Sequence, residues 1–249
     1  MNLEKYKIPM AELSSSTKES IQQKIQYCEF LGYEHANKIH KKKKFSIGIC
    51  RNSRGAALVT CITKMPEVTP KMIDWWFGWH ISESERYRLW HPRDHISSEL
   101  KVDNLNFPTD KEKYIHLDSY VSEYIGEELN SLCISFVEPE EFGFPKLDPD
   151  KETAICAHVK DLNRNVSIGS LTHLVTKTPS GSIMQSSFWL GMNPYHTNSF
   201  INFIVRPIIN LRIIKLILLP DQLTYDLLKH CAEEMSHLAK ILPQLYNDV

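Results

Sequence analysis

The chain has 249 residues, 42% of them hydrophobic, and its 29 Lys and Arg against 30 Asp and Glu give a net charge of −1. This composition excludes wholesale disorder, and the lack of a basic excess argues against a dedicated nucleic-acid-binding protein. The length fits one large domain, or one domain with an extension.

The chain shows no pattern typical of secretion or membrane insertion. Residues 1–18 carry several charges and lack the apolar core of a secretory signal. The densest apolar stretch, residues 200–219, is interrupted by three basic residues and Pro207, so we expect core structure there and no membrane partner. The six cysteines form no CxxC pair, and we interpret them as buried free thiols of a cytoplasmic protein, without a disulfide frame.

The first third of the chain predicts a helix, a hairpin and two short helices. Apolar residues recur at helical spacing over residues 15–31. Residues 45–50 and 56–64 are rich in β-formers on either side of a turn-like segment, which predicts a β-hairpin. A short aromatic helix is expected around residues 72–77, and a second begins at Ser82 or Ser84, which are good helix N-caps.

The remainder predicts an antiparallel sheet followed by one long helix. Turn residues separate five strands, expected at residues 114–125, 131–137, 153–161, 170–178 and 182–190. The final helix begins with Asp221 as its N-cap and runs to about Leu242, before Pro243.

The segregation of strands and helices indicates an α+β fold. A curved antiparallel sheet wrapped around the C-terminal helix, the helix-grip arrangement, fits this element order and leaves a cavity between the two. We expect residues 45–249 to form this domain and residues 1–44 to form an N-terminal helical extension that packs outside the cavity and contributes to a dimer.

The last helix carries ionisable residues on its apolar stripe. His230 and Glu234 fall on the same face as Leu227 and Leu238, one turn apart. Ionisable groups that point into a core need compensation, which a zinc ion or a mutual hydrogen bond can provide. His237 forms a Glu-x-x-His pattern with Glu234, but it lies at the edge of the stripe, as a surface or supporting residue.

Two further segments hold candidate site residues. Residues 72–95 contain four of the five tryptophans and three histidines, together with Tyr87, whose hydroxyl can orient a polar ligand. Glu123 alternates with Val121 along its strand, so both point to one face, which is either the core or solvent. His173 stands on a later strand and can face the same cavity.

Several of these segments resemble the diacetylphloroglucinol hydrolase family, which includes phloretin hydrolase. The resemblance rests on residues 72–95, 123–126, 188–191 and 230–243. It spans most of the chain, roughly residues 66–246. It implies a Bet v 1-like helix-grip fold with an added N-terminal region, a homodimer, and zinc-dependent hydrolysis of the carbon–carbon bond between an acyl group and a phenolic ring.

The resemblance also implies a set of site residues. The zinc ligands would be two histidines and two glutamates, which match His95, Glu123, His230 and Glu234. His91 is a rival for the first position, but its spacing from Tyr87 differs from the family motif. Glu127 and Glu128 are rivals for Glu123.

The substrate would be held by residues beside this ligand set. Tyr87 matches the family's tyrosine that contacts a phenolic hydroxyl, and His173 matches a histidine of the cavity. Ser98 takes the place of the family's asparagine, a departure that bears on the phenolic substrate.

Two other functions stay open: a metal-free carrier of hydrophobic ligands with the same fold, and a zinc hydrolase that acts on a non-phenolic β-dicarbonyl.

Overall fold

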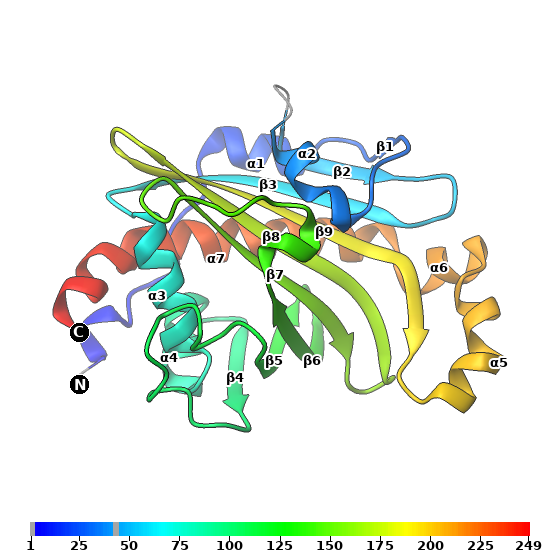
Figure 1. Cartoon of the computed structure of the whole chain (residues 1–249). Coiled ribbons are helices and arrows are strands. Elements are labelled where there is room, and N and C mark those ends of the chain that lie inside the picture. Colours follow the sequence, from blue (N-terminus) through cyan, green and yellow to red (C-terminus); the bar gives the residue numbers. More distant parts are fainter. Residues whose placement is uncertain (1–2, 42–44) are drawn as a thin grey trace.

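The computed structural model describes residues 3–41 and 45–249. Its centre is a nine-stranded curved sheet in the order β1-β2-β3-β9-β8-β7-β6-β5-β4, antiparallel except for the β1–β2 pair (Figure 1). The strands are β1 (Gln26–Tyr27), β2 (Gly48–Arg51), β3 (Ala57–Pro66), β4 (His95–Leu100), β5 (Asp118–Ile125), β6 (Glu128–Val137), β7 (Glu152–Asp161), β8 (Val166–Thr178) and β9 (Gly181–His196).

One long helix, α7 (Asp221–Asp248), crosses the face of this sheet and contacts β2, β3 and β5 (Figure 1). The shorter helices are α1 (Ser15–Ile21), α2 (Ala36–His40), α3 (Pro70–His80), α4 (Ser84–Trp90), α5 (Ser199–Ile209) and α6 (Arg212–Leu218). The described residues also form the 3₁₀ turns η1 (Glu4–Tyr6), η2 (Tyr33–His35) and η3 (Pro139–Phe142). This arrangement confirms the predicted α+β helix-grip fold.

The start of α7 is fixed by a buried cation. The Arg51 guanidinium, 1% exposed, donates to the carbonyl oxygens of Gly55 and Leu219 and pairs with Asp221 at 2.7 Å. Arg51 belongs to β2, so these contacts tie the first turn of α7 to the sheet. The predicted cap is wrong by one residue: Pro220 is the N-cap and Asp221 is the first helical residue.

The main core lies between α7, α3, α4 and the sheet. Its largest fully buried side chains include Trp76, Met65, Ile73 and Leu228. The helix continues past Pro243, contrary to the prediction that it ends there. Leu242 and Leu245 flank this proline and are both fully buried, and their burial compensates for the backbone hydrogen bond that a proline removes.

The N-terminal segment is less helical than predicted. The helix expected at residues 15–31 ends at Ile21, and β1 then pairs with β2 of the main sheet. The segment also packs on α7, where Tyr225 donates to the carbonyl oxygen of Gln23 and Ala11 N–H donates to His237 Nδ1. The expected boundary between residues 44 and 45 falls beside residues 42–44, which lie outside the described part of the chain.

Most of residues 200–219 lie outside the core, which corrects the prediction made from their hydrophobicity. Asn202 accepts a hydrogen bond from the backbone of His196, and Asn210 donates to the carbonyl oxygen of Pro194, so α5 turns its amides toward β9. Its apolar face therefore points outward, with Phe203 83% exposed. None of the described helices is long and apolar enough to cross a membrane.

Two cysteines also depart from the prediction. Cys28 and Cys50 form a disulfide with Cα atoms 6.1 Å apart, because the pairing of β1 with β2 brings them together. The other four, Cys61, Cys133, Cys156 and Cys231, are buried free thiols as expected. The cytoplasmic location stays a prediction.

Candidate metal centre

The β4–β5 pair supplies two of the four predicted ligands. His95 is the first residue of β4, and Glu123 of β5 lies directly opposite it in the strand register. The pleat turns Val121 and Glu123 to the same buried face. Of the two faces that the sequence left open for Glu123, the structure therefore selects the core and not solvent. Glu127 and Glu128 are exposed at the end of this hairpin, so neither faces the interior.

The other two predicted ligands come from the middle of α7. His230 and Glu234 are 5% and 7% exposed, one turn apart on the face that packs against the sheet. Leu227 and Leu238 lie on the same buried face. The hydrophobic stripe therefore carries two ionisable groups into the interior, where β4 and β5 bring two more.

The other three side chains gather around His95 Nε2. His95 Nε2 lies 3.3 Å from His230 Nε2, 3.5 Å from Glu123 Oε2 and 3.6 Å from Glu234 Oε2. His230 Nε2 lies 3.9 Å from Glu234 Oε2. Metal bonds of about 2.0–2.2 Å in a tetrahedral site place neighbouring ligand atoms about 3.3–3.6 Å apart. The observed separations are close to that spacing.

The hydrogen-bond partner of His95 fixes which nitrogen is free. Its Nδ1 lies 3.0 Å from the carbonyl oxygen of Tyr87, and a carbonyl can only accept, so the ring hydrogen sits on Nδ1. The Nε2 lone pair then points at the cluster. The Tyr87 ring stacks on His95 with centroids 3.9 Å apart, and its hydroxyl donates to Glu123 Oε2. Tyr87 therefore orients two of the candidate ligands.

Burial and neighbouring charges shift the pKa values of His95, His230 and Glu234. Burial lowers the pKa of His95 well below its usual value, and the neighbouring imidazoles of His230 and His91 lower it further. Burial raises the pKa of Glu234 to about 8, opposed by the charge of His230. Burial alone would lower the pKa of His230, but Asp94, Glu234 and Glu123 together raise it to about 9.

Tyr87 stays protonated beside these groups. Burial, with the adjacent carboxylate of Glu123, raises the pKa of Tyr87 well above its usual value. Without a cation, a cluster of two buried imidazoles and two buried carboxylates would require extra protons to lower its charge. A divalent cation would satisfy the lone pairs and the negative charges at once.

The three other predicted residues lie elsewhere in the interior. His173 is buried on β8, its Nδ1 2.8 Å from Ser186 Oγ, and burial lowers its pKa to about 3. The Ser98 hydroxyl donates to the carbonyl oxygen of Ile81 and so joins β4 to the end of α3. His237 is fully buried, contrary to the surface position considered for it, and anchors the N-terminal segment.

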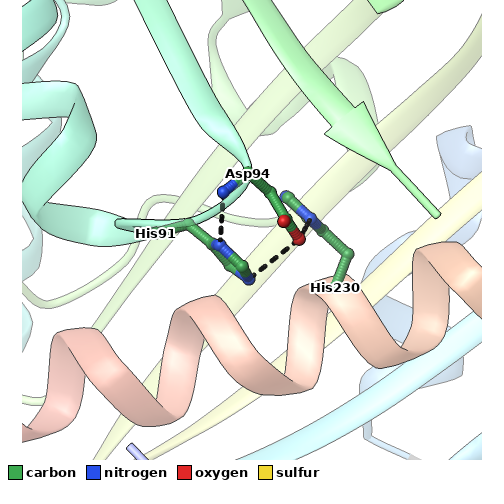
Figure 2. A group of neighbouring side chains, drawn as sticks. All are labelled: His91, Asp94 and His230. Atoms are coloured by element: carbon green, nitrogen blue, oxygen red, sulfur yellow. Dashed lines mark hydrogen bonds and ion pairs between the residues drawn. The ribbon is translucent and has the colours of Figure 1, made fainter. Parts of the chain in front are cut away.

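Sequence reasoning missed Asp94. It precedes His95 and lies between His91 and His230, with its carboxylate facing both rings (Figure 2). The signal was present, because Asp94 is the acidic residue of the Pro-x-Asp-His motif. A surface cavity of about 240 Å³ reaches this side of the cluster and is lined by Arg93, Asp94, Gly126, Asp226, Lys229, His230 and Glu233.

A family model described as the DAPG hydrolase PhiG domain matches residues 33–247, most of the chain. The chain belongs to the DAPG hydrolase family. Two similar proteins are named as hydrolases. Phloretin hydrolase of Eubacterium ramulus is 29% identical over 209 residues, which cover 81% of this chain and 71% of the relative. The 2,4-diacetylphloroglucinol hydrolase of a Pseudomonas species is 30% identical over 209 residues, covering 74% of this chain and 64% of the relative.

Two solved structures that are similar to this DAPG hydrolase family member are distant from it in sequence. Ara h 8.0201 is 10% identical, with a TM-score of 0.36, and the match covers 67% of this chain and all of that one. The major latex-like protein 151 of Panax ginseng is also 10% identical, with a TM-score of 0.36, and the match covers 71% of this chain and 97% of that one.

The described residues of this family member fit a zinc ion. The evidence is the pair of buried Nε2 atoms 3.3 Å apart, with two buried carboxylates beside them. Nitrogen and oxygen donors without thiolate suit zinc, and also manganese or iron. The predicted ligands His95, Glu123, His230 and Glu234 stay candidates, and three of them, His95, Glu123 and His230, lie close enough together to share one ion.

Proposed function

We propose that this chain is a zinc-dependent hydrolase that cleaves the carbon–carbon bond between an acyl group and a phenolic ring. The observation that carries the proposal is the convergence of two imidazole nitrogens and two carboxylates inside the core of a DAPG hydrolase family member. The names of the two relatives supply the substrate class, which is that of acylated polyhydroxyphenols.

The reaction adds water across an aryl ketone. The ring carbon gains a proton and leaves the acyl carbon, and the acyl carbon gains a hydroxyl group and becomes a carboxylic acid. An aryl anion is a poor leaving group, but the keto tautomer of a polyhydroxyphenol turns the bond into that of a β-diketone, whose cleavage leaves a stabilised enolate. A bound zinc ion supplies the positive charge that polarises a ketone oxygen.

The side chains of this chain would divide the remaining tasks. Tyr87 holds Glu123 through its hydroxyl and remains protonated beside it, so it can also orient a phenolic hydroxyl. His173 is neutral near pH 7, because burial lowers its pKa to about 3, so we assign it to hydrogen bonding with a substrate hydroxyl and not to proton transfer. The Ser98 hydroxyl is engaged with Ile81, so its contribution is to hold β4 beside the ligands.

A carrier of hydrophobic ligands is the second candidate. It is disfavoured by the cost of burying four ionisable groups that no metal would compensate. A zinc hydrolase of non-phenolic β-dicarbonyls is the third, and it is compatible with the same ligand set.

We further propose a cytoplasmic homodimer formed through residues 1–44, where Tyr27 is 73% exposed. Light scattering before and after deletion of this segment tests the assembly.

A substrate panel distinguishes the three functions. Zinc-loaded protein should release carboxylic acid from phloretin and from acetylated phloroglucinols, and not from aliphatic β-diketones. His230→Ala and Glu234→Ala should abolish acid release together with zinc content. Acid release from the aliphatic diketones alone would favour the third function, and binding without acid release would favour the carrier.

A further inference from the structure

Asp94 lies between two histidine rings at the edge of the candidate metal centre (Figure 2). Its Oδ2 atom is 3.3 Å from His91 Nε2 and 3.4 Å from His230 Nδ1. The two rings are nearly parallel, with centroids 4.7 Å apart and 8° between their planes. Asp94 is not among the candidate zinc ligands, so its contact with one of them needs a separate explanation.

His230 faces two environments with its two nitrogens. Nε2 points at His95 and Glu234, and Nδ1 points at Asp94. Neutral imidazole carries a single hydrogen, and a carboxylate can only accept one, so the hydrogen belongs on Nδ1. The Nε2 lone pair is then directed at the metal centre. Carboxylates that contact the second nitrogen of a ligating histidine fix its tautomer and ring orientation in this way.

His91 cannot take the role of a ligand without losing an existing hydrogen bond. The backbone N–H of Asp94 donates to His91 Nδ1 at 3.1 Å, so that nitrogen carries the lone pair and Nε2 carries the hydrogen. Nε2 points toward two carboxylate oxygens, Asp94 Oδ2 and Glu233 Oε2, the latter 3.6 Å away. His91 therefore carries its hydrogen on Nε2, which forms a 3.3 Å ion-pair contact with Asp94 Oδ2, and a metal bound to this nitrogen would require an imidazolate anion.

The position of Asp94 is set by contacts at its backbone and at its side chain. Its carbonyl oxygen accepts a 2.8 Å hydrogen bond from the backbone N–H of Tyr124, which follows the candidate ligand Glu123 on β5. Its side chain is held by His91, which is completely buried. Glu233 beside His91 is in turn paired with Arg93 at 2.8 Å. Asp94 thus has little freedom to move away from His230.

We propose that Asp94 is the positioning residue of the metal centre, which holds His230 in the tautomer and orientation that present Nε2 to zinc. His91 and Glu233 hold Asp94 in turn, and neither is a zinc ligand. The proposal rests on the ligand set of the proposed function, and zinc affinity tests it independently of turnover.

The test measures zinc affinity by competition with a chelator. Asp94→Ala should bind zinc about 10–100-fold more weakly than the wild type. Asp94→Asn keeps the shape of the side chain and one acceptor oxygen, so its loss of zinc affinity should be smaller. The matched control is Asp226→Asn, which removes a carboxylate from the same surface cavity and should leave the affinity unchanged. His91→Ala should bind one zinc per chain, with a smaller loss of affinity.

A second readout separates positioning from general structural damage. In zinc-loaded wild type, nitrogen-15 NMR of the histidine rings should show His230 protonated at Nδ1, and Asp94→Ala should change this signal while the His95 signal persists. Wild-type zinc affinity in Asp94→Ala would overturn the positioning role alone. Two zinc ions per wild-type chain, falling to one in His91→Ala, would overturn it in favour of a second metal site. A wild type that binds no zinc would overturn the ligand set and this proposal together.

Discussion

Replacing Glu234 by glutamine should stabilise the metal-free protein, although it removes a candidate ligand. Burial raises the pKa of Glu234 from 4.5 to about 8 in the folded state. A carboxyl group with a raised folded pKa contributes stability that is complete below pH 4.5 and is lost as the pH rises toward 8. Each pH unit in this window costs about 1.4 kcal/mol, so the penalty at pH 7 is about 3 kcal/mol.

Glutamine has nearly the same shape as glutamic acid and does not titrate, so Glu234→Gln avoids this penalty. For a chain of this length, we expect the melting temperature of chelated protein to rise by about 5–10 °C at pH 7, and by far less at pH 5. Thermal unfolding followed by circular dichroism, after chelation and dialysis, measures both values. With zinc added, the wild type should melt at a higher temperature than Glu234→Gln, because only the wild type keeps its full ligand set.

Glu233, the residue before Glu234, provides a control whose replacement should change the melting temperature in the opposite direction. Burial alone would raise the pKa of Glu233, but hydrogen bonds from His91 and Arg93 lower it, so ionised Glu233 stabilises the fold at pH 7. Glu233→Gln should therefore lower the melting temperature of chelated protein. The reasoning would be refuted if chelated Glu234→Gln melted at or below the wild-type temperature at pH 7, since burial would then not raise the pKa of Glu234 in the folded protein.

Three further outcomes follow from the structure. His237→Ala removes the acceptor for the backbone N–H of Ala11, so denaturant unfolding should show a loss of about 1–3 kcal/mol with zinc content unchanged; loss of zinc would contradict its assigned role. Phe203→Ser, at a side chain 83% exposed, should change the unfolding free energy by less than about 0.5 kcal/mol, whereas a core residue would cost several times more. Zinc affinity should rise about tenfold or more per pH unit between pH 6 and 8, because zinc must displace the proton that His230 holds up to a pKa of about 9 in metal-free protein; a pH-independent affinity in competition assays would count against His230 as a ligand.

The sheet and the long helix could be predicted from local pattern alone. Turn residues and alternation separate the strands, and the leucine stripe identifies the buried face of α7. The strand β4 was missed. Its six residues, His95–Leu100, show no clear alternation, and they form a strand because β5 lies beside them. Tertiary pairing of this kind leaves little trace in a short segment.

The hydrophobicity of residues 200–219 led to a wrong prediction, because it does not say which face of a helix is buried. Residues 200–219 are apolar enough for a core, but Asn202 and Asn210 bind the backbone next to α5 and turn the apolar face outward. The helix predicted for residues 15–31 ended early, because β1 pairs with β2 and places Cys28 beside Cys50. Both outcomes depend on partners that are distant in the sequence.

The sequence carries signals for the candidate ligands, whereas most of the contacts that support them depend on the fold. His230 and Glu234 could be identified as ionisable residues on an apolar stripe. Glu123 could be placed on one face of its strand, but the sequence did not say whether that face is buried. The choice of His95 over His91 depends on hydrogen bonds to backbone groups, the Tyr87 carbonyl in one case and the Asp94 N–H in the other. Backbone partners of side chains cannot be read from residue spacing.

Titration of chelated protein with zinc, followed by the release of carboxylic acid from an acetylated phloroglucinol, tests the central claim most directly. If one zinc ion held by His95, Glu123, His230 and Glu234 is required, the rate should rise in proportion to added zinc and level off at one equivalent per chain. Acid release that persists at full rate in chelated protein, or that requires a second equivalent of zinc, would contradict the account.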